Sequence, residues 1–141
     1  DTRLYIKCEE RKKKYTLVNS ERKKVTSYHM DGGIVTDVVS KCDYLYAIEG
    51  QKPIVILIEL KGVDVLKAMT QIDNTLTLFK SFFDNCSNVY GRIVVASAVP
   101  KLNANPIYVK LYKKLAKSYK GNLKVGSIQF IEKDTELSTT K

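Results

Sequence analysis

The sequence predicts an α/β domain in which an antiparallel meander of strands is extended by parallel strands and flanked by helices. Apolar runs of strand length, rich in β-branched residues, recur along the chain. Two longer segments instead repeat their apolar residues with the period of an amphipathic helix. The 141 residues are enough for one domain with a single core, so we interpret 1–141 as one domain.

The N-terminal part is predicted to consist mainly of short strands. The first dozen residues fit a strand or a short helix equally well. Strands are predicted over 15–18 and 25–30, since both are rich in β-formers. A turn signal at Asn19 and a basic stretch separate them.

The central feature is a predicted hairpin. Residues 42–48 contain β-formers, 49–53 hold a glycine and a proline, and 54–58 are an unbroken apolar run that indicates a buried strand. If the hairpin is centred on Gln51, residues equidistant from it form pairs. That register places Asp43 directly opposite Glu59.

The second half of the chain alternates helices with strands. A helix is predicted over 64–83, begun by Asp64, and the apolar run 89–99 is a further strand, which makes a parallel strand–helix–strand unit. A second helix begins at Asn105-Pro106 and extends to about Lys120, where Gly121 ends it. We expect a last strand over 123–131 and a frayed polar tail over 132–141.

Three charged residues converge at one end of the hairpin. Residues directly opposite in an antiparallel pair share a face of the sheet, and Lys61 shares it because strand side chains alternate. Two carboxylates this close, Asp43 and Glu59, repel unless one is protonated or a cation lies between them. Carboxylate oxygens favour Mg²⁺ or Mn²⁺, and a lysine can hold a phosphate or orient a water. The pattern indicates a metal-dependent phosphodiesterase.

Asp43, followed after fifteen residues by Glu59-Leu60-Lys61 at the end of an apolar strand, resembles the core of the PD-(D/E)xK nuclease superfamily. That superfamily includes restriction endonucleases, Holliday-junction resolvases and exonucleases. The resemblance covers residues 40–100 and is only topological elsewhere. One departure is that Cys42, rather than proline, precedes the aspartate.

The resemblance implies a restriction-endonuclease-like fold and a nuclease with DNA as the expected substrate. Asp43 and Glu59 are then expected to hold Mg²⁺ or Mn²⁺ together with the Leu60 carbonyl, and Lys61 to position the attacking water. Several branches of the superfamily carry, on the corresponding helix, a glutamine that points towards the metal site, and Gln71 is the candidate for it here. An N-terminal acidic residue, Glu9 or Glu10, is a further candidate. A homodimer is expected from the resemblance alone.

Other interpretations remain open. Glu59 and Lys61 also fit a solvated strand end, and Gln71 fits a solvent-facing helix position equally well. The whole domain also fits a catalytically inactive nucleic-acid-binding module of the same fold. A third alternative is an interaction subunit of a larger defence or repair complex.

The net charge of +9 is unevenly distributed. The segments 1–30 and 101–124 are strongly basic, whereas 31–100, which holds the proposed site, is slightly acidic. This arrangement suits a polyanion held by flanking basic surface, although lysines that only solvate the surface would give the same pattern. The candidate nucleic-acid contacts are Arg22, Lys23 and Lys24, and one face of the second helix with Lys110, Lys113, Lys114, Lys117 and Lys120.

Several other classes of protein are disfavoured. No apolar run approaches the roughly 20 residues of a membrane helix, so no membrane partner is expected. Three widely spaced cysteines and the lack of a leader at the start favour a reducing cytoplasm. His29 is the single histidine, which is too few for a histidine-rich zinc site and leaves a Ser-His-Asp triad without recognisable partners. A structural role is expected for it.

Overall fold

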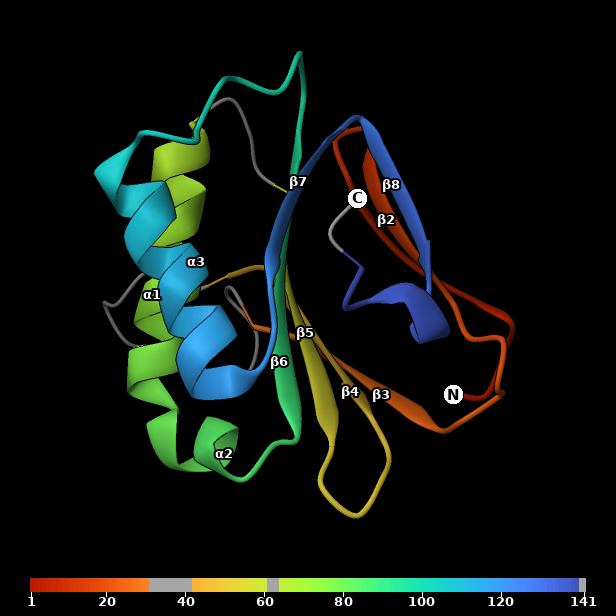
Figure 1. Ribbon diagram of the computed structural model, residues 1–141. Coiled ribbons are helices and arrows are strands. Elements are labelled where there is room, and N and C mark those ends of the chain that lie inside the picture. The colour runs from red at the N-terminus through yellow and green to blue at the C-terminus, as the bar shows by residue number, and fades with distance from the viewer. Residues whose placement is uncertain (31–41, 61–63, 140–141) are drawn as a thin grey trace.

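Two β-sheets and a layer of helices form the computed structural model, which describes residues 1–30, 42–60 and 64–139. Helices α1 and α3 cover one face of the larger sheet, and the smaller sheet lies on its other face (Figure 1). In chain order the elements are β1 (Tyr5–Glu10), β2 (Lys13–Val18), β3 (Val25–His29), β4 (Tyr44–Ile48), β5 (Ile54–Glu59), α1 (Val65–Leu78), α2 (Lys80–Asp84), β6 (Asn88–Val95), α3 (Pro106–Tyr119), β7 (Leu123–Ser127), β8 (Gln129–Lys133) and the 3-10 helix η1 (Asp134–Glu136).

Each sheet contains both parallel and antiparallel pairs, as predicted for this α/β chain. The chain nevertheless forms two sheets, whereas one was expected. The larger sheet has the order β3-β4-β5-β6-β7, with antiparallel pairing from β3 to β5 and parallel pairing from β5 to β7. The smaller sheet has the order β1-β2-β8. The meander of the larger sheet therefore begins at β3, because β2 pairs with β1 and β8 instead.

The β4–β5 hairpin has the predicted register. Tyr44 lies opposite Ile58, and Ile48 lies opposite Ile54, so each pair is equidistant from Gln51. Strand β5 is buried over five of its six residues because β4 and β6 flank it and the helices and the smaller sheet cover its faces. This burial explains why the sequence of β5 is almost uninterrupted in its apolar character.

The first helical segment is shorter than predicted. Asp64 caps α1 by accepting a hydrogen bond from the Lys67 amide at 3.0 Å, as expected. The chain then leaves the helical conformation at Phe79 (φ −114°, ψ 38°), and α2 follows as a separate helix. This change of direction buries Phe83, whose ring meets that of Tyr119 edge to face at 6.4 Å.

Helix α3 begins as predicted and ends differently. The Asn105 side chain accepts from the amides of Ile107 and Tyr108, and Pro106 occupies the first turn. Lys120, and not Gly121, takes the left-handed conformation at its end, with φ 52°. Gly121 has another role, since a Cβ there would collide with the Val89 carbonyl.

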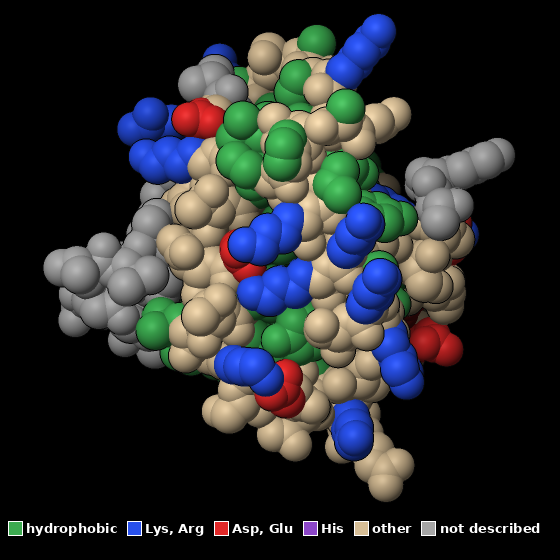
Figure 2. Space-filling model, turned by 60° about the vertical axis from the view of Figure 1, so that its left-hand side comes forward, with side chains coloured by type: hydrophobic (Ala, Val, Ile, Leu, Met, Phe, Trp, Pro, Cys, Tyr) green, Lys and Arg blue, Asp and Glu red, His purple; other side chains and the backbone are tan. Residues whose placement is uncertain are grey.

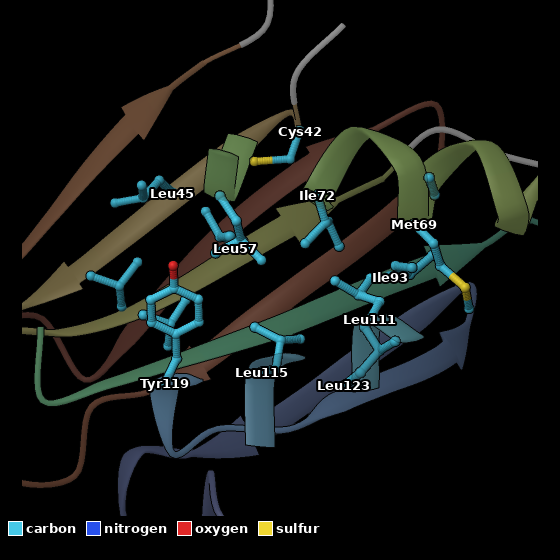
Figure 3. Close-up of a cluster of buried hydrophobic side chains, with 14 of the residues drawn as sticks. Cys42, Leu45, Leu57, Met69, Ile72, Ile93, Leu111, Leu115, Tyr119 and Leu123 are labelled. Atoms are coloured by element: carbon cyan, nitrogen blue, oxygen red, sulfur yellow. The ribbon is translucent and has the colours of Figure 1, made fainter. Parts of the chain in front are cut away.

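Two apolar clusters cover the two faces of the larger sheet. In one, side chains of the sheet such as Leu57 and Ile93 meet Ile72 of α1 and Leu111 and Leu115 of α3 (Figure 3). The other fills the space between the two sheets and includes Tyr15, Leu17, Tyr46, Ile56 and Ile58. Alternate residues of β4 and β5 therefore belong to different clusters.

The C-terminal part of the chain corrects three predictions. The expected strand over 89–99 ends at Val95, and the expected strand over 123–131 divides into β7 and β8 at Ile128, whose φ is 64°. The Ile128 amide donates to the Val95 carbonyl at 2.8 Å, and the chain crosses there from the larger sheet to the smaller. Residues 132–137 are not a frayed tail, because Glu132 belongs to β8 and Leu137 is only 3% exposed.

Candidate functional site

Asp43 and Glu59 lie at the same end of the β4–β5 hairpin. One further step in the register beyond Tyr44 and Ile58 brings the two acidic residues opposite each other. Both are also on the helix-covered side of the sheet, because Leu45 and Leu57, two residues away, pack in the cluster beneath the helices. Asp43 and Glu59 are each 0% exposed.

Asp43 and Glu59 share neighbouring groups at this end of the hairpin. The Leu60 amide donates to Asp43 Oδ2 at 2.8 Å, which holds the aspartate against the end of β5. Burial raises the pKa of the Cys42 thiol to about 12, and the negative charges of Glu59 and Asp43 contribute to the rise. Both charges therefore act on one buried thiol that lies two residues before the start of β4.

Helix α1 contacts this end of the hairpin through Thr75. The Cys42 amide donates to Thr75 Oγ1 at 3.0 Å, and Thr75 Oγ1 donates to the Gln71 carbonyl at 2.8 Å. Gln71 is 6% exposed, so the solvent-facing interpretation of this residue is wrong. The sequence analysis did not identify Thr75, although its position four residues after Gln71 places the two residues on one side of the helix.

The donor set at the hairpin end fits a small divalent cation. Two carboxylates and a main-chain carbonyl are hard oxygen ligands, and Mg²⁺ usually takes one or two carboxylates and completes its shell with water and substrate phosphate. Within residues 1–30, 42–60 and 64–139, no group of three His, Cys, Asp or Glu side chains is placed to hold a metal ion. Asp43 and Glu59 are therefore two buried carboxylates at this end of the hairpin, and Lys61 lies outside the described residues.

A polar cluster lies on the opposite face of the same strand end. Tyr44 donates from its hydroxyl to Glu10 Oε1 at 3.5 Å, and the same carboxylate oxygen is 3.7 Å from His29 Nε2. The His29 and Tyr44 rings stack with centroids 4.7 Å apart. Of the two N-terminal acidic candidates, Glu10 is therefore near the hairpin end, whereas Glu9 is exposed on the other face of β1.

The predicted basic face of α3 is only partly available to a ligand. Leu111, Leu115 and Tyr119 are buried, and Figure 2 shows Lys and Arg side chains spread over the helical side of the molecule with a few carboxylates among them. Lys114 Nζ is 2.6 Å from Asp73 Oδ1 of α1, so this lysine links the two helices. The other candidate cations are exposed: Lys110, Lys113, Lys117, Lys120, Arg22, Lys23 and Lys24.

A separate cleft of about 900 Å³ lies beside the start of α3. It is lined by residues 99–106 together with Tyr108, Leu123 and Val125. Neither Asp43 nor Glu59 contributes to it, so the cleft does not mark the carboxylate site. In the part of the chain that is described, no helix has the length and apolar character needed to cross a membrane.

The comparisons with known proteins leave the family open. No family model, no curated protein and no solved structure matches this chain.

Proposed function

We propose that this protein is a metal-dependent nuclease with a restriction-endonuclease-like fold, and that DNA is its substrate. The observation that supports the proposal is the register of the β4–β5 hairpin, which, continued by one step, puts Asp43 opposite Glu59, together with the burial of both residues. Two adjacent carboxylates at a strand end suit the binding of a cation that also contacts a phosphate. The free thiols Cys8, Cys42 and Cys86 support a reducing, cytoplasmic setting.

Each residue has a distinct part in this proposal. Asp43 and Glu59 hold Mg²⁺ or Mn²⁺ together with the Leu60 carbonyl. The Leu60 amide fixes one oxygen of Asp43, which leaves the orientation of that carboxylate set before the ion binds. A bound Mg²⁺ or Mn²⁺ supplies Lewis-acid polarisation of the phosphate and a more acidic bound water.

Lys61 and Gln71 complete the proposed set. Lys61, two residues after Glu59, orients the attacking water and offsets the charge that develops on the phosphate. Gln71, on the buried side of α1, supports the site from the helix.

Cleavage of labelled DNA and RNA with Mg²⁺ or Mn²⁺ tests this proposal. We expect cleavage by the unchanged protein, and a loss of about 100-fold or more in Glu59→Gln and in Lys61→Ala, because each removes a group that acts on the transition state. Lys61→Ala retains metal binding, measured by calorimetry, because a charged lysine is not a ligand. Glu49→Gln, at the other end of the hairpin, is the control and keeps full activity. Cleavage that survives both substitutions contradicts the proposal.

A second candidate is a nucleic-acid-binding domain that does not cleave. The observation that favours it is the complete burial of both carboxylates, since an attacking water and a phosphate must reach them for catalysis. In this case the protein binds nucleic acid with strong salt dependence, and chelators change nothing. Chelator-sensitive cleavage decides between the two functions.

A further inference from the structure

The tip of the first hairpin has a strained backbone. Glu10 pairs with Lys13, so Arg11 and Lys12 form a two-residue loop between β1 and β2. Their φ values are 47° and 71°, so both lie in the left-handed region. A loop with two successive residues of this kind is a type I′ turn, for which Asn-Gly is the favoured sequence. A side chain with a Cβ is disfavoured in this conformation, apart from Asn and Asp.

The residues that occupy this turn are therefore not those that stabilise it best. Asn-Gly fits the same backbone with less strain, yet the chain places two long cations there. Backbone strain of this kind persists where the surrounding structure enforces it, and it is concentrated at functional positions. The side chains of Arg11 and Lys12 are both exposed.

Two carboxylates lie across the hairpin from this tip, Glu9 opposite Lys14 and Glu10 opposite Lys13. Among the described residues, no carboxylate forms an ion pair with any of the four successive cations Arg11, Lys12, Lys13 and Lys14. Lysines elsewhere do form such pairs, as Lys80 does with Asp84 at 2.7 Å. Residues 9–14 thus carry four cations and two carboxylates, and this net positive charge suits a polyanion.

Lys13 differs from the other three cations because it is buried. It is only 6% exposed, and it lies on the same face of β2 as Tyr15, which packs between the sheets. Glu10 is its partner across the hairpin, but the Glu10 carboxylate is directed to Tyr44 and His29. Lys13 is thus largely removed from water, and no carboxylate among the described residues pairs with it, so a bound phosphate is a suitable counter-charge.

The β1–β2 tip lies near the end of the larger sheet at which Asp43 and Glu59 are found. Glu10, at the end of β1, contacts Tyr44, which directly follows Asp43 in the chain. On the other side, the Lys14 amide donates to the Ile128 carbonyl at 2.9 Å, and the Ile128 amide donates to Val95 at the end of β6. Figure 1 accordingly shows the β1–β2 turn beside the link between β7 and β8. The carboxyl ends of parallel strands, where β5 ends in Glu59, meet at this edge.

We infer that Arg11, Lys12 and Lys13 form a phosphate-binding tip that holds the sugar-phosphate backbone of a nucleic acid next to the Asp43–Glu59 site. This inference rests on the proposed function for the identity of the polyanion. The tip binds backbone phosphates without reading the bases, because it offers cations and no fixed partner for a base edge.

The test is a binding titration of fluorescently labelled single- and double-stranded DNA, carried out in EDTA so that no cleavage occurs. Arg11→Asn with Lys12→Gly removes two charges and relieves the strained turn. We expect it to raise the Tm by a few degrees and to weaken binding about 10-fold. The slope of log affinity against log salt falls by roughly 0.7 to 0.9 for each phosphate that the protein no longer neutralises. Lys13→Met keeps the apolar stem, removes the ammonium and lowers the slope by the amount that corresponds to one phosphate.

The matched control is Lys7→Gln with Lys52→Gln, which removes the same charge from two exposed positions away from the tip. It keeps the slope of the unchanged protein. Equal affinity and slope in Arg11→Asn with Lys12→Gly overturn the inference, and so does a Tm that does not rise. Preference for polyglutamate over DNA, or absence of binding by the unchanged protein, also overturns it. Binding through the tip without cleavage in Mg²⁺ or Mn²⁺ refutes the nuclease and leaves the tip in place.

Discussion

Arg92 is a fully buried cation that joins the two sheets. Its Nε lies 2.7 Å from Glu132 Oε2 of β8, and its Nη2 donates to the Leu137 carbonyl at 2.9 Å. The same Glu132 oxygen accepts from the Tyr15 hydroxyl at 2.6 Å. Burial, followed by the Glu132 charge, raises the pKa of Tyr15 well above its ordinary value, so the phenol remains a donor. A guanidinium removed from water in this way depends on its carboxylate.

Glu132→Ala is therefore expected to destabilise the fold by about 3–5 kcal/mol, because it leaves the buried charge of Arg92 without a counter-charge. Urea unfolding followed by circular dichroism measures the loss. Glu136→Ala is the matched control and changes stability by less than about 0.5 kcal/mol, since Glu136 is exposed on the surface 3-10 helix. A replacement of both Arg92 and Glu132 by apolar residues recovers part of the loss. Equal stability of Glu132→Ala and Glu136→Ala contradicts this account.

The pairing of Arg92 with Glu132 could not be predicted from the sequence. The two residues are 40 positions apart, and no local pattern links them. Glu132 instead stands among polar residues near the end of the chain, which favoured its assignment to a tail. Asp43 and Glu59 were different, because a short turn fixes the register of a hairpin and hence which residues face each other.

At the scale of elements, the sequence predicted what local chemistry determines. The caps at Asp64 and Asn105 are as expected, because a side-chain acceptor at the start of a helix is a local signal. The break at Phe79 and the crossing at Ile128 were missed. Neither residue is a glycine or proline, and both conformations are set by packing and pairing with distant parts of the chain.

Helix α3 carries a prediction of its own. Lys113→Glu with Lys117→Glu is expected to weaken nucleic-acid binding steeply and to lower the salt slope by roughly 0.7 to 0.9 for each phosphate that the helix no longer neutralises. Both lysines are exposed, whereas Lys114 is paired with Asp73 and is kept unchanged. Binding titrations at several salt concentrations measure the effect.

The control for α3 is Lys7→Glu with Lys52→Glu, which makes the same change in charge at two other exposed positions. If both double variants bind alike, the α3 face serves only to solvate the helix. In that case Arg22, Lys23 and Lys24 become the next residues to test.

At the scale of the whole molecule, the presence of a second sheet was the main feature that sequence reasoning missed. The smaller sheet pairs β2 from the start of the chain with β8 from its end, and such long-range pairing leaves no periodic signal between the partners. The second sheet has consequences for the site. It covers the face opposite α1 and brings Glu10 against Tyr44, beside the strand end that holds Asp43.

The C-terminal segment is predicted to hold these layers together. Leu137 is 3% exposed, and its carbonyl accepts hydrogen bonds from Arg92 Nη2 and Asn122 Nδ2, both at 2.9 Å. A chain that ends at Lys133 lacks both the apolar side chain and the shared acceptor. We expect it to unfold at a Tm clearly lower than that of Leu137→Ala, which loses about 2–5 kcal/mol from the side chain alone. The difference arises because two buried donors keep their acceptor in Leu137→Ala and lose it in the truncated chain.

Thermal unfolding of the unchanged protein, Leu137→Ala and the truncated chain measures both steps, with Glu136→Ala as the control for an exposed residue in the same segment. A truncated chain as stable as the full one would mean that the segment is a frayed tail after all, and that the buried guanidinium of Arg92 is held sufficiently by Glu132, Asn122 and the Gly91 carbonyl.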